Sequence, residues 1–409
     1  MRLAVFTSKF PSQVCTFFAR DMRGLLETGV EIDIFPLYPE DRSLWRFVPA
    51  ILSEKVLPRE RVHYTSGLPQ FGPPKSWESF QNFASGGGAA VGDALATGLL
   101  PTAKTAYAWL KSWNWGREPW PRFDHVLGYW GNYAATAAYL FCRLRGGEEP
   151  FSIFLHAGTD LYRDPIYLRQ KLAAARHVLV CTDFNRRYLA EAFPDIAPEV
   201  ERKLFLHQHG LDLEELHFEV DGRTANRVVG VGGLQKGKGF DSLIRICRIL
   251  RDRGVPIDVE LVGDGPQREP LERLSRDLGL ESHVRFRGWL PFVEARESIR
   301  RAAVLVHPSA GLGDGAPNVI KEAMALGTPV VASAVAGIPD LLEGGRAGLL
   351  VPPKDPEALA SAVGTLLADA PLRRAVADRA RQSAEACFDL WKNGRALADV
   401  LRDRGAEVS

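Results

Sequence analysis

The sequence predicts an α/β protein with two doubly wound domains that face a central cleft. Short apolar runs alternate with amphipathic stretches, the alternation stops and restarts near residue 226, and Gly-rich turns follow several of the apolar runs. Strands that alternate with helices form parallel sheets, and such sheets bind ligands at the carboxyl ends of their strands. The length of 409 residues also exceeds that of a usual single domain, so two are expected.

The first half opens with a strand at Leu3–Thr7, an amphipathic helix that ends at Gly29, and a second strand in EIDIFPLY. Residues 67–120 break this pattern because they are rich in Pro, Gly and Trp. We expect an irregular or helical insertion there, whose aromatic side chains either pack in the core or line a surface that meets something apolar. The alternation then resumes, with strands expected in FDHVLGYW, FSIFLHAG, HVLVCTDF and KLFLHQHG.

The polar, charged segment 211–226 predicts an interdomain linker. After it, the strand RVVGVGGL leads into a helix from Phe240 to Arg253. We therefore expect one domain at 1–215 and another at 216–387. Further strands of the second domain are expected in VELVGDG, VRFRGWL, AVLVHPS and PVVA.

Composition excludes several classes of protein. The net charge of +1 suggests no nucleic-acid partner. The apolar runs are too short to span a membrane, and the N-terminus lacks the features of a signal peptide, so a cytoplasmic protein is expected. The five cysteines are odd in number and show no CxxC spacing, which argues against disulfides or a zinc site. They are Cys15, Cys142, Cys181, Cys247 and Cys387.

The stretch GDGAPNVIKEAMALGTPVVAS, residues 313–333, predicts an anion site. A helix that starts near Pro317 and Asn318 would point its free N–H groups into the preceding loop, which suits a diphosphate. Glu322 follows one turn later and could accept hydrogen bonds from ribose hydroxyls, while Asp314 could contact a sugar ring. Taken singly, a solvated glutamate and a turn-forming aspartate are the simpler interpretation.

A second Gly-rich loop, GVGGLQKGKGF at 230–240, also follows a strand and precedes a helix. Lys236 and Lys238 add positive charge to it. Gln235 stands where the dinucleotide fingerprint needs glycine, and no Walker A sequence occurs. A third loop, VELVGDGP, places Gly265 after a strand. For both loops a plain turn remains the alternative.

Five ordered blocks within residues 228–365 resemble the nucleotide-sugar half of retaining glycosyltransferases of family 4, which have the GT-B fold of two Rossmann-like domains. The resemblance implies that Glu322 holds the ribose, that Lys238 contacts the diphosphate, and that Asp314 takes part in catalysis at the donor sugar. In relatives a C-terminal helix returns to the first domain, which we expect here at 388–409. The blocks are VGVGGLQKGKGFDSLI, VELVGDGPQREPLERL, VRFRGWLP, DGAPNVIKEAMALGTPVVAS and VAGIPDLLEGGRAGLLVPPKDPEALA.

The donor-binding residues implied by the resemblance are Gly232, Gly233, Lys236, Lys238, Gly265, Asp314, Gly315, Ala316, Pro317, Asn318 and Glu322. Two of them depart from the family pattern. Gly233 stands where many members have an arginine that contacts phosphate, and Asp314 stands where many have a longer glutamate.

The first half resembles the family less closely. KFPSQVCTFFARDM is similar to an acceptor-side loop, with Val14-Cys15 in place of Ser-Glu, and LHAGTDLYRDP is similar to the family's "HGxD" loop. The resemblance implies that His156 is catalytic, although a histidine at a strand end is more often structural. It implies acceptor-side positions at Pro11, Thr16 and Asp160.

A pair of histidines, His207 and His209, precedes the expected linker. Two histidines at this spacing can bind a metal, but no third ligand follows at a sensible distance along the sequence. No metal or other cofactor is therefore expected. His209 and Asp212 would instead lie near the cleft.

The expected function is retaining, metal-independent transfer of a hexose from a UDP- or GDP-sugar to a glycan, lipid-linked or small-molecule acceptor. The absence of an Asp-x-Asp sequence favours metal independence.

Peripheral association with the inner face of the cell membrane could use residues 67–120, or the arginines at 373, 374, 379 and 381. A non-catalytic GT-B scaffold is one alternative, and an NAD(P)-dependent oxidoreductase is a second, which the Gly spacing disfavours. The oligomeric state stays open.

Overall fold

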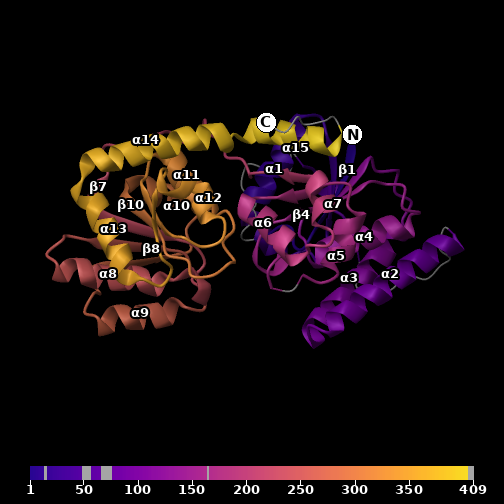
Figure 1. The fold of residues 1–409 in the computed structure, drawn as a ribbon, viewed down its shortest axis with the longest axis horizontal. Helices are drawn as coiled ribbons and strands as arrows, with labels where there is room; N and C mark the ends of the chain where they lie inside the picture. Colours follow the sequence, from indigo (N-terminus) through magenta and orange to yellow (C-terminus); the bar gives the residue numbers. More distant parts are fainter. Residues whose placement is uncertain (13–15, 48–56, 66–75, 164, 404–409) are drawn as a thin grey trace. The chain divides into compact units, whose positions relative to one another are not determined.

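A computed structural model describes residues 1–409 except 13–15, 48–56, 66–75, 164 and 404–409. The chain forms two compact units (Figure 1). Unit 1 comprises Met1–Gly210 together with Leu390–Ser409, and unit 2 comprises Leu211–Asp389. The division between the units therefore lies at residues 210 and 211, where the sequence suggested 215 and 216.

Unit 1 is built on a parallel sheet of six strands in the order β2-β1-β3-β4-β5-β6. Most strand positions carry buried apolar side chains, as expected of a sheet covered by helices on both faces. The strands are β1 (Arg2–Thr7), β2 (Glu31–Pro36), β3 (His125–Gly128), β4 (Phe151–Leu155), β5 (Val178–Val180) and β6 (Leu204–Leu206). The main helices are α1 (Thr16–Glu27), α4 (Tyr133–Leu144), α5 (Leu168–Ala174), α6 (Asp183–Ala192) and α7 (Ala197–Arg202).

The described part of the predicted insertion is a helical hairpin, α2 (Trp77–Leu95) and α3 (Leu99–Arg117), that packs against α4. Its aromatic side chains divide between the two predicted environments. Trp115 is fully buried in an edge-to-face contact with Phe6 of β1, whereas Trp77 is 67% exposed. Three leucines at the turn between the helices, Leu95, Leu99 and Leu100, are exposed.

Unit 2 repeats the design with the strand order β12-β11-β10-β7-β8-β9. Its strands are β7 (Thr224–Val231), β8 (Asp258–Val262), β9 (Val284–Gly288), β10 (Ala302–His307), β11 (Val330–Ser333) and β12 (Leu349–Val351). Its helices are α8 (Phe240–Asp252), α9 (Arg268–Asp277), α10 (Phe292–Arg301), α11 (Asn318–Leu326), α12 (Ile338–Leu341), α13 (Pro356–Ala368) and α14 (Ala370–Cys387).

The predicted linker at 211–226 is wrong, because this segment is an integral part of unit 2. Leu211 and Leu216 are buried in the unit 2 core. Arg223 donates hydrogen bonds to the carbonyls of Arg300 and Leu326 at 2.6 and 2.8 Å, and the segment then enters β7. Its polar composition conceals these anchors.

The last helix, α15 (Leu390–Leu401), belongs to unit 1 and packs on α1. Gly24 and Gly394 face each other there, so closely that a Cβ added to Gly394 would lie 2.6 Å from Cα of Gly24. The C-terminal helix that was predicted to return to the first domain thus packs closely on α1. It is a separate helix, because α14 ends at Cys387 and α15 begins at Leu390.

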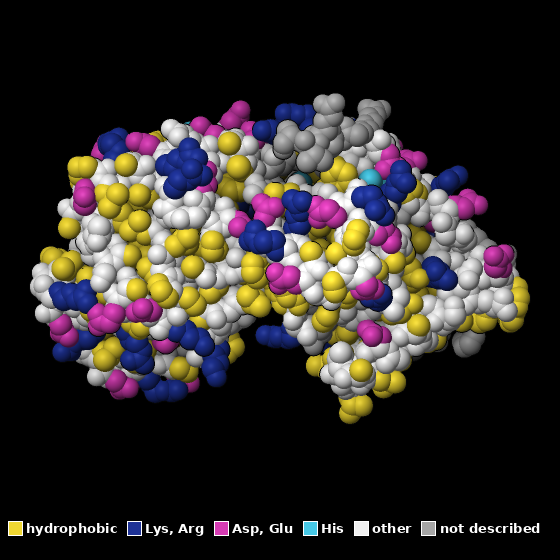
Figure 2. All heavy atoms as spheres, in the orientation of Figure 1, with side chains coloured by type: hydrophobic (Ala, Val, Ile, Leu, Met, Phe, Trp, Pro, Cys, Tyr) yellow, Lys and Arg dark blue, Asp and Glu magenta, His cyan; other side chains and the backbone are white. Residues whose placement is uncertain are grey.

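Charges of both signs are interspersed on the visible surface (Figure 2). The arginines that suggested a lipid-binding patch are already engaged with protein groups. Arg374 pairs with Asp221 at 2.6 Å, Arg379 binds Glu343 at 2.7 Å, and the other two donate to backbone carbonyls. Within the described ranges, no helix combines the length and apolar character required to cross a membrane.

Candidate active site

Two loops of unit 2 meet at the carboxyl ends of β7 and β10, which are paired in the sheet. The first is the Gly-rich loop between β7 and α8, and the second leads from β10 to α11. Ala310 N–H donates to the carbonyl of Gly237 at 2.9 Å, and Ser309 Oγ donates to the same carbonyl at 3.2 Å. The two segments that suggested anion binding in the sequence therefore form one structure.

The close contact of these loops requires glycine at position 239. Gly239 has φ +68°, and a Cβ there would lie 2.0 Å from the carbonyl oxygen of Pro308. Gly265 serves the same purpose for the loop after β8, since a Cβ on it would lie 2.6 Å from the carbonyl oxygen of Leu234. Gly232 is joined to the end of β8 by its N–H, which donates to Val262 at 2.9 Å. These glycines position backbone at the sheet edge.

Asp314 is the electrostatic centre of the site. Its carboxylate forms an ion pair with Lys238, and its Oδ2 lies 3.2 Å from His307 Nε2. Burial alone would raise the pKa of Asp314, but the hydrogen bond and attraction from His307, together with Lys238, hold that pKa well below its usual range. The carboxylate therefore stays charged in a largely buried position.

His307, the last residue of β10, is a site residue that the sequence analysis missed. It is 3% exposed and contacts Oδ2 of Asp314, whereas Lys238 contacts Oδ1. The only available signal was a histidine at the end of a predicted strand, which by itself more often has a structural role.

The N-terminus of α11 adjoins this loop. Pro317 is the N-cap residue and supplies no side-chain hydrogen bond to the first turn. The Oδ1 atom of Asn318 is buried and has no hydrogen-bond partner in the part of the chain that the structure describes. Glu322 lies one turn further along and is 7% exposed. The positive dipole end of the helix and the N–H groups of a first turn without a side-chain cap can bind an anion, whereas Asn318 Oδ1 is an acceptor and would bind a hydroxyl group.

The remaining predicted donor residues lie in the same two loops. Lys236 is exposed in the loop between β7 and α8. Gly315, Ala316 and Pro317 form the segment between Asp314 and α11. Gly233 borders open space, because the atom nearest to an added Cβ is Nε2 of Gln235, 3.8 Å away. A Cβ at this position would therefore make only an ordinary van der Waals contact.

Unit 1 brings two of its predicted site residues together. His156 follows β4, and its Nδ1 lies 3.2 Å from Oδ2 of Asp160, which is 2% exposed. The His156 ring lies beside Phe154, Tyr129 and Trp130 in an aromatic enclosure. The other two acceptor-side predictions are Pro11, which is buried, and Thr16, which begins α1; Val14 and Cys15 lie outside the described residues.

A second polar group in unit 1 surrounds Asp21 of α1. His209 Nδ1 lies 2.7 Å from its Oδ2, His207 Nε2 lies 3.4 Å from its Oδ1, and Tyr129 donates its hydroxyl proton at 2.6 Å. Burial alone would raise the pKa of Asp21, but attraction from His209 and His207 holds it well below its usual range.

The Asp21 group also corrects the expectation that the two histidines lack a third potential metal ligand. Asp21 and Cys181 are both close to His209 in space, with Cys181 Sγ 3.4 Å from His209 Nε2, although both are remote from it in sequence.

Comparison with known proteins agrees with the fold and identifies the family. Residues 225–369 match the family model described as glycosyl transferases group 1. An alpha-D-kanosaminyltransferase of Streptomyces kanamyceticus is 32% identical over 66% of this chain and 75% of its own length. The amylovoran biosynthesis glycosyltransferase AmsK of Erwinia amylovora is 26% identical over 98% of this chain and 99% of its own length. The chain spans only 45% of another curated relative, a putative colanic acid biosynthesis glycosyltransferase, WcaL, of Escherichia coli, at 33% identity.

Solved structures share the two-unit architecture. The crystal structure of Anabaena Alr3699/HepE in complex with UDP superposes with a TM-score of 0.68 at 17% identity, covering 98% of this chain and 99% of that one. Two parallel six-stranded sheets with flanking helices, and neighbours of this kind, define an α/β protein of the GT-B class. The chain belongs to the glycosyl transferases group 1 family and is a glycosyltransferase. The resemblance found in the sequence is thereby confirmed.

Proposed function

We propose that this protein transfers a hexose from a UDP- or GDP-sugar to a hydroxyl group, with retention of anomeric configuration. The observation that carries the proposal is the arrangement of Lys238, Asp314 and the N-terminus of α11 in one pair of joined loops. It combines a cation, a fixed carboxylate and helix N–H groups, which match a diphosphate and the hydroxyl groups of a sugar. A structural neighbour, Anabaena Alr3699/HepE, is in complex with UDP, which supports the same donor class.

In this proposal the interaction partners of Lys238 and Asp314 change when the donor binds. Lys238 is held by Asp314 in the free protein, and an incoming diphosphate would share its positive charge. Asp314 would keep its bond to His307 and present an oxygen to the donor sugar. Glu322 would accept hydrogen bonds from the ribose hydroxyls. The first-turn N–H groups of α11 would stabilise the leaving diphosphate, so the departure of this group would need no metal ion.

We further propose a glycan or lipid-linked acceptor. Relatives carry names that refer to colanic acid, amylovoran and phosphatidylinositol monomannoside, so polymeric and lipid acceptors are both represented among them. The exposed turn of the α2–α3 hairpin offers a lipid contact through Leu95, Leu99 and Leu100, which are 60%, 86% and 64% exposed. Hydrophobic side chains are visible on this hairpin in Figure 2. Such leucines can enter the apolar layer of a membrane surface.

The test is a calorimetric titration with UDP, GDP, ADP and NAD, followed by measurement of donor turnover. We expect one nucleoside diphosphate to bind and its sugar conjugate to be consumed, with binding reduced about tenfold or more in Glu322→Ala. Glu269→Ala is the matched control, because Glu269 is exposed on α9 and pairs only with Arg273 among the contacts described. Binding without turnover would favour the scaffold alternative, and binding of NAD alone would contradict the proposal.

A further inference from the structure

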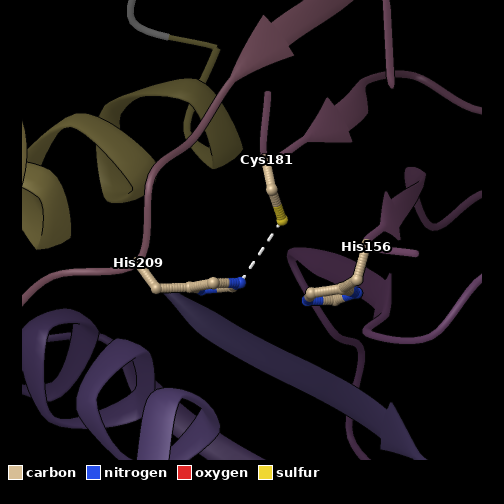
Figure 3. A group of neighbouring side chains, drawn as sticks. All are labelled: His156, Cys181 and His209. Atoms are coloured by element: carbon tan, nitrogen blue, oxygen red, sulfur yellow. Dashed lines mark hydrogen bonds between the residues drawn. The ribbon is translucent and has the colours of Figure 1, made fainter. Parts of the chain in front are cut away.

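Three side chains at the carboxyl end of the unit 1 sheet converge on one point. His156 follows β4, Cys181 follows β5 and His209 follows β6, and these strands are consecutive neighbours in the sheet. Figure 3 shows the thiol and the two imidazoles pointing toward one another from these three segments. Their potential ligand atoms all lie within 4.8 Å of one another. The topology of the sheet thus assembles residues that are far apart in sequence.

Each of the two histidines is oriented by a carboxylate. His209 Nδ1 lies 2.7 Å from Asp21 Oδ2, and His156 Nδ1 lies 3.2 Å from Asp160 Oδ2. A carboxylate on one ring nitrogen fixes the tautomer and makes the other nitrogen, Nε2, the better metal ligand. Both imidazoles therefore have the supporting contact that metal-binding histidines usually have.

The spacing of these atoms fits a zinc ion, and Cys181 Sγ also lies 3.8 Å from the carbonyl oxygen of Leu155. Cys181 Sγ lies 3.4 Å from His209 Nε2, and a sulfur and a nitrogen on one tetrahedral zinc are about 3.5 Å apart. The side chain of His156 is 9% exposed. Its Nε2 atom is buried and has no hydrogen-bond partner among the described residues. A buried polar atom of this kind carries a cost unless something binds it.

We propose that His156 Nε2, Cys181 Sγ and His209 Nε2 bind one Zn²⁺ ion, with a fourth coordination position open. Imidazole and thiolate ligands select Zn²⁺ over Mg²⁺ and Ca²⁺, which prefer oxygen. On binding, a Zn–S bond replaces the S–H bond of Cys181, and the proton leaves to solvent. The thiolate and the carboxylates of Asp21 and Asp160 offset the charge of the ion.

This site goes beyond the proposed transfer reaction, because its three ligands belong to unit 1 whereas the proposed diphosphate-binding residues belong to unit 2. It replaces the predicted catalytic role of His156 with that of a metal ligand. By joining the ends of three strands, the ion would fix the loops that follow β4, β5 and β6. Unit 1 should consequently unfold at a higher temperature when Zn²⁺ is present.

A second combination of ligands, formed by Asp21, His207 and His209, is also compact. An ion there would displace the 2.7 Å contact between Asp21 and His209 Nδ1 and the 2.6 Å hydrogen bond from Tyr129. The first combination keeps both of these contacts, and for this reason we assign the ion to it.

The test uses the full chain without an affinity tag, stripped of metal by a chelator and titrated with ZnCl₂ in the absence of nucleotide. We expect one ion per chain with a Kd of about 1 μM or lower, and binding at least about 100-fold weaker in Cys181→Ala. Cys142→Ala is the matched control, because Cys142 is a buried cysteine of the same unit with no place in the cluster. Its affinity for Zn²⁺ should equal that of the wild type.

A second measurement guards against variants that fail to fold. Co²⁺ bound to the wild-type protein should show the near-ultraviolet absorption of a sulfur-to-cobalt charge transfer, because the proposal requires a thiolate ligand. The proposal is overturned if the wild type binds no stoichiometric Zn²⁺, if bound Co²⁺ lacks that absorption, or if Cys181→Ala binds Zn²⁺ normally. None of these readouts depends on donor binding, so the proposed transfer function can fail or succeed independently.

Discussion

At the scale of single residues, the ion pair between Lys238 and Asp314 controls the electrostatics of the proposed donor site. Asp314 is 7% exposed, so its charge must be balanced by protein groups when no donor is bound. The sequence was sufficient to select both residues, because each stands in a recognisable loop. It could not select His307, which becomes a neighbour of Asp314 only through the path of the loop after β10.

Lys238→Met should destabilise the ligand-free protein by about 1–3 kcal/mol, since it removes the cation that pairs with the buried Asp314 carboxylate and leaves the contact with His307. Lys236→Met is the control within the same loop, and its effect should stay below about 0.5 kcal/mol because Lys236 is exposed. Urea denaturation without nucleotide measures both changes. Equal effects of the two substitutions would argue that the ion pair contributes nothing to stability.

Gly233→Arg should strengthen binding of the nucleoside diphosphate about tenfold. Open space surrounds the position, its φ lies outside the left-handed region, and an arginine there could form charge-assisted hydrogen bonds with phosphate. Gly233→Met, which adds length without charge, is the matched control in the same calorimetric titration. An arginine variant that binds no better than the methionine variant would show that the diphosphate lies elsewhere.

His125 should make the stability of the protein sensitive to mild acid. It is buried on β3 with Nε2 2.8 Å from Ser152 Oγ, and burial, followed by repulsion from His177, lowers its pKa from 6.5 to about 4. Between these two values the unfolded chain binds a proton and the folded chain does not, so the free energy of unfolding decreases as the pH falls from 6.5 toward 4. The full loss is about 3 kcal/mol.

His125→Gln should therefore flatten the decrease in urea midpoint between pH 7 and pH 5 relative to the wild type. His217→Gln, a change at an exposed histidine of unit 2, should leave the slope as it is. If the slope of His125→Gln matches that of the wild type, His125 is not the group that titrates.

At the scale of elements, the exposed turn of the α2–α3 hairpin is the predicted membrane contact. The double substitution Leu99→Asp and Leu100→Asp should reduce binding to vesicles of phosphatidylethanolamine and phosphatidylglycerol at least tenfold, because a buried leucine contributes about 1.5–3 kcal/mol. Val293→Asp, at a position on α10 that is 75% exposed, is the control for added negative charge. Vesicle sedimentation that shows no difference between the variants would exclude this hairpin as the contact.

Helices and strands could be predicted where the sequence pattern that specifies them is local, and could not be predicted where their placement depends on long-range contacts. The alternation of strands with helices, and the start of α11 after Pro317, can be predicted from the sequence. The periodicity of hydrophobic residues and the residue types at a helix N-terminus are local properties. The linker predicted at 211–226 is wrong because the anchors of this segment are long-range, with the Arg223 guanidinium bound to carbonyls 77 and 103 positions away. The convergence of His156, Cys181 and His209 escaped notice for the same reason, since it depends on the order of parallel strands.

At the scale of the whole molecule, the two units follow the same design. Each has a six-stranded parallel sheet, and each places one group of buried charged and imidazole side chains close to the carboxyl ends of its strands, while other such groups, among them His125 at the start of β3, lie elsewhere. In unit 2 these groups form the proposed donor site, and in unit 1 they form the proposed zinc site. One architectural rule therefore accounts for both proposals, since the carboxyl edge of a parallel sheet is where loops and polar groups collect.

The most direct measurement of the central claim is a crystal structure with the nucleoside diphosphate that binds in calorimetry. The account predicts phosphate oxygens about 3 Å from the first-turn N–H groups of α11 and from Lys238 Nζ, with the ribose hydroxyls on the Glu322 carboxylate. A nucleotide bound away from α11, or one whose ribose makes no contact with Glu322, would contradict the assignment of the donor site.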